Sequence, residues 1–390
     1  MFYRVSNAVI APNLVKDLAL STETLGILGG AFFYSFALLQ IPMGILLDRV
    51  GPRIIMSCFA FIGAAGALIF AASHSLILAL LGRILLGAGM AAMLMGSLKV
   101  FVLRFSPRQF ATLSGTLVSV GTLGCLLASS PLAYLAQTIG WRMTFFYSGV
   151  ITAALGCLSF LILKDHEDTA AVSAPSQPDG DMGLLRLGRL VLGNPSFWMI
   201  GAFAFFRYGT FVTLQGLWLG PYLMEVKGFS PIQAGNLIMA LSVGFITGAP
   251  VSGYLLDRLF HSTKLTTLCG VSIYALLLIP LSGASDINSA AAFSALFFAV
   301  GFFNSFGTFA FAHVKQLFPL RISGSVIAGI NFFSMSGAAI LMPVLGKVIE
   351  AFSPGGGTNS PQAFHLAFLV CCIGMASSII FYAFSQDARA

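Results

Sequence analysis

The chain has 390 residues, of which 57% are hydrophobic and only 8% are charged, and its mean hydropathy is +0.93. This composition excludes a soluble globular domain. The net charge is +7. Because the cations gather at the ends of apolar segments, we attribute this charge to membrane topology and expect no nucleic-acid partner.

Twelve apolar segments are predicted to cross the bilayer, whose hydrocarbon core is about 30 Å thick. They form two groups of six, separated by a polar stretch rich in Pro, Ser and Asp. We therefore expect an all-α membrane protein with an N-terminal six-helix bundle at 1–163, a linker at 164–196 and a C-terminal six-helix bundle at 197–390. The predicted spans are 1–15, 24–47, 54–73, 76–103, 110–136, 143–163, 197–223, 231–256, 265–283, 289–314, 322–349 and 363–385.

The two groups share a sequence repeat. The segment Gly44–Arg49 (GILLDR) recurs 209 residues later as Gly253–Arg258 (GYLLDR), and the same offset, without a gap, pairs Gly26 with Gly235. A half-length repeat in so apolar a chain predicts two homologous bundles with pseudo-twofold symmetry. The substrate site of such a protein lies near the bilayer midplane, between the halves.

The first predicted span is shorter than its counterpart in the repeat. The seventh span begins near Phe197, and the 209-residue offset maps this point to a position before residue 1. Residues 1–15 are also too few to cross the membrane alone. We therefore expect the first helix to be truncated at its N-terminus, with these residues forming only its outer half.

The distribution of cations predicts the orientation. Twelve Lys and Arg residues flank the spans on the side that carries the linker and both Asp-Arg loops, whereas four lie on the other side. Cytoplasmic loops carry an excess of these residues, so the linker and both termini are expected to be cytoplasmic. The short loops favour the inner membrane of a bacterium as the location.

Three motifs carry a resemblance to a known family. They are Gly44-x-x-x-Asp48-Arg49-x-Gly51-Pro52-Arg53 between spans 2 and 3, Arg83-x-x-x-Gly87-x-Gly89 in span 4, and Gly140-Trp141-Arg142-x-x-Phe145 at the start of span 6. With these motifs the chain resembles the major facilitator superfamily over its whole length.

The resemblance implies the major facilitator fold, with a cytoplasmic gate and conformational switch at the loop motif. Glycines 44 and 253 are expected to let neighbouring helices approach closely. The alternative is that the loop charges only set topology. The predicted gating residues are Gly44, Asp48, Arg49, Gly51, Arg53, Arg83, Gly253, Asp257 and Arg258.

A narrower resemblance concerns two arginines. Arg4 precedes Pro12 by eight residues, which resembles the first span of the organophosphate:phosphate antiporters. The segment Phe206–Gly209 resembles the start of their seventh span, but Arg207 precedes Pro221 by fourteen residues. The similarity therefore carries over better to Arg4 than to Arg207, and specificity for phosphate esters does not follow from it.

Charges within the spans have one sign. All thirteen acidic residues fall in loops, at span ends or in the linker, whereas Arg4, Arg83, Lys99 and Arg207 fall inside spans. Each such cation costs roughly 2.5–3.5 kcal/mol at a span centre, so each is expected to face a partner or a cavity. Because no carboxylate lies inside a span, we expect the counter-charge to be a transported anion.

Arg4 and Arg207 are the strongest candidates for binding this anion. They lie on spans that the repeat relates, each roughly 5 Å from the midplane at 1.5 Å per residue. A guanidinium fork suits carboxylate, phosphate or sulfonate groups. The alternatives are a structural arginine bonded to backbone carbonyls and, for Lys99, a side chain that extends to the cytoplasmic surface.

Aromatic and amide residues in the spans complete the predicted site. For the aromatic residues the alternative is packing or an interfacial belt, and Trp218 is equally suited to anchor the outer interface. His313 is a candidate for proton coupling or, alternatively, a structural histidine. The predicted substrate-binding residues are Tyr3, Arg4, Asn7, Lys99, Arg207, Tyr208, Gln215, Asn304 and Asn331.

These features predict a secondary active transporter that moves a small organic anion by alternating access. Its expected partners are this substrate, protons or a counter-anion, and the lipid bilayer, with the protein a monomer. The first alternative is a multidrug or cation exporter of the same superfamily, although span 5 lacks the Gly-Pro pair that such exporters often carry. The second alternative is a transporter-like membrane sensor.

No enzyme, cofactor or metal is predicted. The sequence has no nucleophile–base pair and no cluster with metal-ligand spacing. All six cysteines fall within apolar spans, where small packing residues are the expected role.

Overall fold

The described part of the chain is helical. The computed structural model describes residues 1–163, 191–285, 287–318, 323–353 and 359–387, and these residues contain helices and no β-strand. Most of the predicted linker, residues 164–190, lies outside the described residues.

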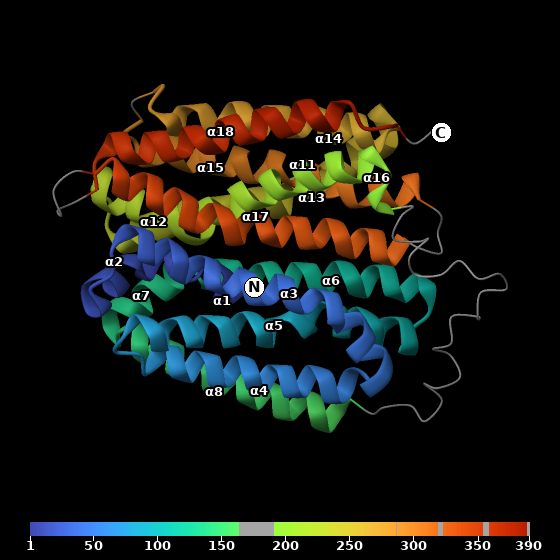
Figure 1. Cartoon of the computed structure of the whole chain (residues 1–390), viewed down its shortest axis with the longest axis horizontal. Coiled ribbons are helices and arrows are strands. Elements are labelled where there is room, and N and C mark those ends of the chain that lie inside the picture. Colours follow the sequence, from blue (N-terminus) through green and yellow to red (C-terminus); the bar gives the residue numbers. More distant parts are fainter. Residues whose placement is uncertain (164–190, 286, 319–322, 354–358, 388–390) are drawn as a thin grey trace. The chain divides into compact units, whose positions relative to one another are not determined.

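The described helices are shown in Figure 1. In chain order they are α1 (Phe2–Val5), α2 (Asn7–Leu18), α3 (Thr22–Val50), α4 (Pro52–Ala71), α5 (Leu76–Arg104), α6 (Pro107–Leu127), α7 (Ser130–Thr138), α8 (Trp141–Ile162), α11 (Pro195–Thr213), η1 (Leu214–Trp218), α12 (Leu219–Pro221), η2 (Tyr222–Val226), α13 (Pro231–Leu255), η3 (Leu256–Phe260), α14 (Thr263–Leu278), η4 (Ile279–Ser282), α15 (Ala290–Asn304), η5 (Ser305–Phe309), α16 (Ala310–Leu317), α17 (Ser323–Ala351) and α18 (Pro361–Ala383).

The lengths of these helices fit a membrane protein. Among the described residues, ten helices are long and apolar enough to cross a bilayer, and the pair Thr116–Leu127 and Ser130–Thr138, bent by 41°, makes an eleventh. The pair corresponds to the predicted fifth span. The predicted first span consists of the short helices α1 and α2. The prediction of an all-α membrane protein is confirmed.

The chain divides into two compact units. Unit 1 comprises residues 1–30, 121–139 and 195–390, and unit 2 comprises residues 31–120 and 140–194. Unit 1 therefore contains segments from both halves of the sequence repeat. The bundle boundaries inferred from the sequence, at 163 and 197, stay a prediction.

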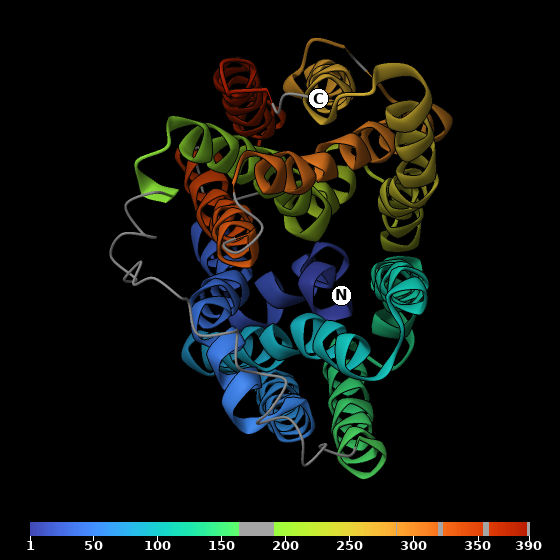
Figure 2. The ribbon, with the colours of Figure 1, turned by 90° about the vertical axis from the view of Figure 1, so that its right-hand side faces the viewer.

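Unit 2 is built around α4, which packs against both α5 and α8 (Figures 1 and 2). Small residues allow this contact: a Cβ on Gly89 would lie 2.2 Å from the backbone nitrogen of Gly63. Aromatic side chains fill the other side, where the Phe70 ring centroid lies 4.8 Å from that of Phe145. Backbones that approach this closely are typical of helix packing in membranes.

Unit 1 contains the longer helices of the second half. Helix α11 packs against α17 and α18, and α13 packs against α15. Segments of the first half join them, because α2 contacts α12 and η1, and α7 contacts α13. Both sequence halves therefore contribute to the packing of this unit.

Several long helices of unit 1 are locally distorted. The segments η1, η2 and η3 are π-helical, and η5 is a 3-10 turn. Pro221 lies between η1 and η2, and because it has no backbone N–H, the carbonyl one turn earlier loses its ordinary partner. Such π segments are frequent at functional sites. The sequence did not predict them.

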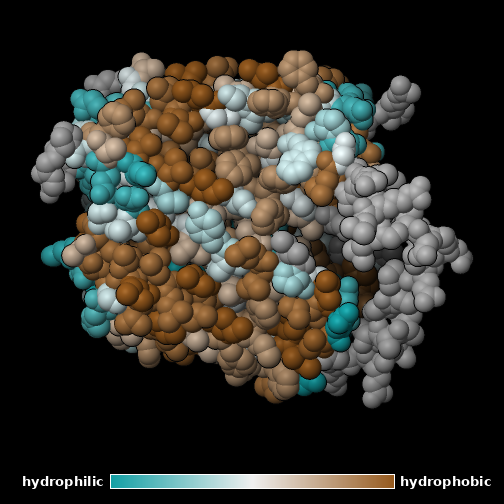
Figure 3. Space-filling model, in the orientation of Figure 1, coloured by the Kyte–Doolittle hydropathy of each residue, from teal (hydrophilic) through white to brown (hydrophobic). Residues whose placement is uncertain are grey.

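The surface is apolar over the middle of the helices (Figure 3). Large hydrophobic side chains are exposed on these helices, among them Leu38 on α3 (64% exposed) and Ile77 on α5 (79% exposed). In water an exposed apolar area of this extent is unfavourable, whereas lipid accommodates it. The hydrophilic residues gather near the helix ends in this view.

The helices α3 and α13 each carry one copy of the Asp-Arg motif near their C-terminal end, with Asp257 in the continuing segment η3. We call this the motif end of a helix, and we call the opposite end, where α3 begins at Thr22 and α13 at Pro231, the distal end. The cytoplasmic location inferred from the sequence for the motif end stays a prediction.

Candidate functional site

A hydrogen bond joins the first helices of the two sequence halves within unit 1. The guanidinium of Arg4, on α1, donates from Nη1 to the hydroxyl oxygen of Tyr208, on α11, at 2.6 Å. The guanidinium carbon lies 6.0 Å from the centroid of the same ring. Two of the predicted substrate-binding residues, 204 residues apart in sequence, are thus brought together. Arg4 as a whole residue is half-buried.

Neighbouring polar residues on α2 and α11 are buried without internal partners. Both amide atoms of Asn7 have no hydrogen-bond partner among the described residues, although its side chain is only 1% exposed. The hydroxyls of Thr210 and Thr213 are in the same condition. Buried polar groups are nearly always hydrogen-bonded, so such groups in the middle of a membrane helix are candidates for contact with a polar ligand or water.

Two further predicted residues lie near this pair. Tyr3 is buried on α1, next to Arg4. Gln215, in the π segment η1, donates from Nε2 to Ser242 Oγ on α13 at 2.9 Å. Ser242 was not singled out from the sequence. A single serine among many in apolar helices carries no distinctive pattern.

Arg207 is held inside unit 1 by α15. Its Nη1 donates to the backbone oxygen of Asn304 at 3.2 Å and to the Asn304 side-chain oxygen at 3.3 Å. The side chain runs against Gly307, where a Cβ would lie 2.0 Å from Arg207 Cδ. Arg207 is 3% exposed and Asn304 is 1% exposed. This placement matches the alternative of an arginine bonded to a backbone carbonyl. The substrate role of both residues stays a prediction.

Two other predicted aromatic or amide residues can be placed. Asn331 is half-buried on α17. Trp218 is fully buried, and its indole Nε1 donates to the carbonyl of Met342 on α17 at 3.1 Å. The suggestion that Trp218 anchors the outer interface is therefore wrong, because an interfacial anchor exposes its ring to the lipid headgroups.

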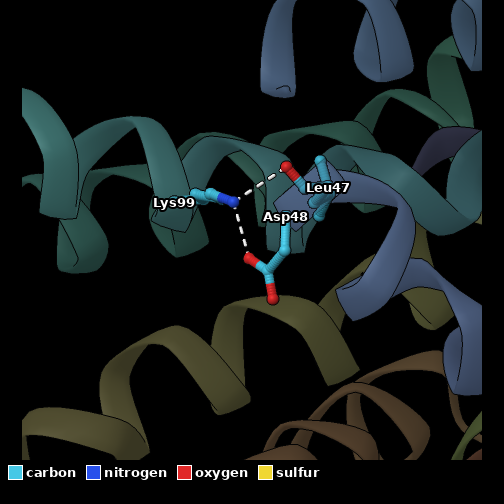
Figure 4. Close-up of polar contacts among 3 residues, drawn as sticks. All are labelled: Leu47, Asp48 and Lys99. Carbon is cyan, nitrogen blue, oxygen red and sulfur yellow. Dashed lines mark hydrogen bonds and ion pairs between the residues drawn. The ribbon is translucent and has the colours of Figure 1, made fainter. Parts of the chain in front are cut away.

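Lys99 forms an ion pair with the loop motif in unit 2 (Figure 4). Its Nζ lies 2.6 Å from Asp48 Oδ1 and donates to the carbonyl oxygen of Leu47 at 2.8 Å. The expectation that no carboxylate balances the cations of the spans is therefore wrong for Lys99. The two residues are 51 positions apart, on α5 and at the end of α3. The sequence does not show which side of each helix faces the other, so this pair was not predicted.

The rest of the first loop motif joins α4 to α8. Gly51 has φ of 92°, a value that favours glycine, and precedes Pro52 at the start of α4. Arg53 donates from Nε to the carbonyl of Phe160 at 2.9 Å, and its guanidinium carbon lies 4.2 Å from the centroid of that ring. Arg49 is exposed.

The second copy of the motif lies in a π segment. Asp257 and Arg258 belong to η3 and are exposed. The expected close helix approach at Gly44 and Gly253 is absent, because a Cβ on either glycine would meet no atom of the described residues within 4 Å. Open space surrounds both positions in this conformation. The gating role of the two motifs stays a prediction.

Arg83 is enclosed by aromatic rings in unit 2. It is 1% exposed, and its guanidinium carbon lies 5.2 Å from the Phe32 centroid and 5.9 Å from the Phe70 centroid. Gly87, one turn further along α5, lets Phe32 approach, since a Cβ there would lie 2.0 Å from the Phe32 carbonyl oxygen. The spacing of arginine and glycines thus allows α5 to pack tightly around a buried cation.

The motif at the start of α8 also has a packing role. Gly140 has φ of 84°, and the Trp141 ring centroid lies 5.3 Å from that of Phe70. Arg142 donates from Nη2 to the carbonyl of Ser73 at 2.9 Å. These contacts fix the entry of the chain into α8.

His313 has two hydrogen-bond partners. Its Nδ1 lies 2.8 Å from the hydroxyl of Tyr382, and its Nε2 lies 2.9 Å from the backbone oxygen of Gln386. Since a carbonyl oxygen only accepts, Nε2 donates, and in the neutral ring Nδ1 accepts from Tyr382. This arrangement matches the alternative in which His313 is a hydrogen-bonded structural histidine.

The comparison with protein families decides the class of protein. A family model described as Major Facilitator Superfamily matches residues 1–342, and a second match covers residues 209–389. The chain belongs to the major facilitator superfamily. The recognition made from the three motifs is confirmed, and the chain is a multi-span membrane protein of this superfamily.

Several members of the superfamily are similar to this chain in sequence. A probable L-galactonate transporter of Escherichia coli strain K12 is 24% identical over 97% of this chain and 84% of its own length. A D-galactonate transporter of Escherichia coli O6:H1 is 22% identical, over 90% of this chain and 86% of its own. A probable sulfoacetate transporter of Cupriavidus necator is 23% identical over 67% of this chain, and the match spans 62% of that protein.

Solved structures show the same fold. A bacterial homologue of the human lysosomal transporter Spinster, in an inward-facing and occupied conformation, matches with a TM-score of 0.76 and 18% identity, covering 98% of this chain and 93% of that chain. A D-xylose-proton symporter matches with a TM-score of 0.74 and 15% identity, covering 100% of this chain and 95% of that chain. The predicted major facilitator fold is confirmed.

Proposed function

We propose that this protein is a secondary active transporter that moves a small organic anion across the membrane by alternating access. The observation that carries the proposal is the bond between Arg4 and Tyr208, which places the guanidinium of a half-buried arginine where the first helices of the two halves meet. A guanidinium in a membrane helix is unfavourable unless it is neutralised, and an anion neutralises it.

The relatives support an acid as the substrate. Their names specify galactonate and sulfoacetate, which are a sugar carboxylate and a sulfonate, and a further relative in Bacillus subtilis is named a hexuronate transporter. Relatives in Chlamydia are named probable hexose phosphate transport proteins. These substrates are small and polar, and each carries at least one anionic group that matches the arginine fork.

In the proposed site Arg4 binds the anionic group, and Tyr208 holds the guanidinium in position. Asn7 and the buried threonine hydroxyls of α11 offer hydrogen bonds to the polar body of the substrate. Arg207, held by Asn304, adds a second positive charge on the neighbouring residue of α11. Transport is coupled to protons or to exchange for a counter-anion.

Binding measurements on the purified protein test the substrate's charge. We expect sugar acids, sulfoacetate or hexose phosphates to raise the melting temperature in detergent, whereas their neutral methyl esters or parent sugars do not. Loss of a hydrogen bond to a charged group costs about 1.5–3 kcal/mol, which corresponds to roughly 10–100-fold weaker binding of the ester. Equal stabilisation by an acid and its ester would contradict the proposal, and stabilisation by lipophilic cations alone would favour the exporter.

A further inference from the structure

Arg207 carries a buried charge that no described residue balances. Its side chain is 3% exposed, and its two hydrogen bonds, both from Nη1, go to the neutral oxygens of Asn304. Among the described residues its Nε has no hydrogen-bond partner, and no carboxylate forms an ion pair with it. A buried charge without a counter-charge is unfavourable in a membrane protein, so a group besides Asn304 is expected to neutralise the guanidinium.

The unpartnered Nε of this guanidinium lies close to α14. A Cβ on Gly307, in the 3-10 turn η5, would lie 2.0 Å from Arg207 Cδ, 2.8 Å from Arg207 Nε and 3.2 Å from Val271 Cγ2 on α14. Arg207 Nε and α14 therefore lie beside the same glycine. Tyr274 follows Val271 by three residues, on the same face of α14.

Tyr274 adds a second buried donor at this position. Its side chain is 0% exposed, and its hydroxyl has no hydrogen-bond partner among the described residues. The phenol is close enough to the Arg207 guanidinium and to the Cys371 thiol, on α18, to interact electrostatically with both. Buried tyrosine hydroxyls usually have a partner, so one without a partner in the protein is a candidate for binding a ligand.

Helices of the second sequence half enclose the cluster of Arg207, Tyr274 and Cys371. Helix α18 packs against α11 and α14, and α14 also packs against η5. These elements all belong to unit 1. The cluster is therefore separate from the bond between Arg4 and Tyr208, which joins the two halves.

The chemistry of this cluster matches a small anion. The guanidinium N–H, the phenol O–H and the thiol S–H are all donors, and the guanidinium carries a full positive charge. A water molecule would satisfy the donors but leave the charge unbalanced, whereas an anion does both. The low exposure of Arg207 and Tyr274 favours a monatomic ion over an organic acid.

We propose that the second half binds one chloride ion between Arg207 Nε, the Tyr274 hydroxyl and the Cys371 thiol. The ion is a fixed ligand that neutralises Arg207 and connects α11, α14 and α18, and it is not the transported substrate. While bound, it offsets the positive charge that Arg207 adds near the substrate site. The inference goes beyond the proposed function, because it requires neither an organic anion nor alternating access.

Thermal unfolding of the purified protein in detergent tests the chloride site. Raising sodium chloride from zero to about 100 mM is expected to raise the melting temperature of the parent by about 2–4 °C more than that of Tyr274→Phe. Ionic strength acts on both proteins alike, so the difference between them isolates the site. Without chloride, Tyr274→Phe is expected to melt no lower than the parent, because the hydroxyl that it loses has no described partner.

Two control variants separate this site from other effects. Tyr382→Phe makes the same change at another fully buried tyrosine of unit 1, whose hydroxyl is bonded to His313. It is expected to melt at a lower temperature than the parent and to keep the full chloride response. Arg4→Gln is also expected to keep this response, because Arg4 lies outside the cluster.

Anomalous scattering locates the ion directly. In crystals of the full chain grown with sodium bromide, we expect one bromide peak within contact distance of Arg207 Nε and the Tyr274 hydroxyl. The same peak is expected to be absent from crystals of Tyr274→Phe or much weaker there. A peak in the parent crystals without any chloride response in solution would mean binding at crystal concentration only, and would overturn the proposal.

Two results in solution would also overturn it. An equal chloride response in the parent and in Tyr274→Phe would exclude the cluster as the site. Loss of the response in Arg4→Gln, with Tyr274→Phe responding as the parent does, would place chloride in the substrate site. Failure to bind organic anions, together with a chloride response that depends on Tyr274, would reject the proposed substrate and leave the chloride site intact.

Discussion

Arg4→Lys is expected to abolish transport although it keeps the positive charge. Lysine presents a compact ammonium, which reproduces neither the planar fork nor the bond to Tyr208 in its present geometry. The loss of a bidentate charged interaction in a low-dielectric site corresponds to roughly 10–100-fold weaker binding of the anion. Uptake of a labelled substrate into proteoliposomes measures the transport rate, and binding in detergent measures the affinity for the anion.

Tyr208→Phe is the matched variant for this prediction. It removes only the hydroxyl that accepts from Arg4, so binding is expected to weaken less than in Arg4→Lys. If Tyr208→Phe binds as the parent does and Arg4→Lys does not, the tyrosine merely neighbours the site. Normal uptake by the double variant Arg4→Gln, Arg207→Gln would end the anion hypothesis and favour drug export.

The Arg207 variants separate binding from stability. Arg207 links α11 to Asn304 and is almost completely buried, so Arg207→Gln is expected to lower the melting temperature as well as anion affinity. Arg207→Lys is expected to be milder, because an ammonium can still donate to the Asn304 carbonyl. Arg4 is half-buried near the start of the chain, and its variants are expected to leave the melting temperature nearly unchanged.

Asp48→Asn is expected to slow transport by about tenfold or more while leaving the dissociation constant of the substrate within about twofold, the kinetic pattern of an altered conformational step. The change removes the ion pair with Lys99, 2.6 Å away, and weakens the connection between the end of α3 and α5. The Asp48 side chain is 64% exposed, and an exposed pair contributes only about 0.2–1 kcal/mol to stability, so the variant is expected to fold.

Variants of Lys99 distinguish a role in holding Asp48 from a role in binding substrate. If its role is to hold Asp48, Lys99→Gln reproduces the kinetics of Asp48→Asn, and the double variant is no slower than either single one. If Lys99 binds substrate, Lys99→Gln weakens affinity and the effects of the two changes add. Asp257→Asn, in the exposed second copy of the motif, is expected to have a weaker effect on the rate. Parallel losses of affinity and rate in both aspartate variants would place them in the substrate site.

The class of fold was readable from the sequence because membrane spans impose simple requirements. A span needs about 20 apolar residues, and the repeat with its three motifs then limits the topology to one family. Glycines in the motifs of α5 and α8 correspond to observed packing: Gly87 admits Phe32, and Gly140 starts α8 with a positive φ. Glycine has few uses inside a bilayer besides close packing and turns, yet the close approach expected at Gly44 and Gly253 is absent.

The face that each helix turns toward its neighbours was harder to infer. In a soluble helix the polar face identifies the surface, but a membrane helix is apolar toward both lipid and neighbouring helices, so its sequence barely marks the buried face. The pairing of Lys99 with Asp48 was for this reason not predicted, and Trp218 was considered for the interface although it is fully buried. The π segments around Pro221 also rotate the residues beyond them away from a regular 100° progression.

The C-terminal residues have a practical consequence for producing this protein. Three helices hold Ser385 and Gln386: Lys264 on α14 donates to the Ser385 carbonyl at 2.6 Å, His313 on α16 donates to the Gln386 carbonyl at 2.9 Å, and the Gln386 N–H donates to Ser196 on α11 at 3.0 Å. Deletion of the residues after Ala383 leaves the imidazole and the ammonium without these acceptors, and lower yields of folded protein are expected. A tag attached beyond Asp387 keeps all three bonds.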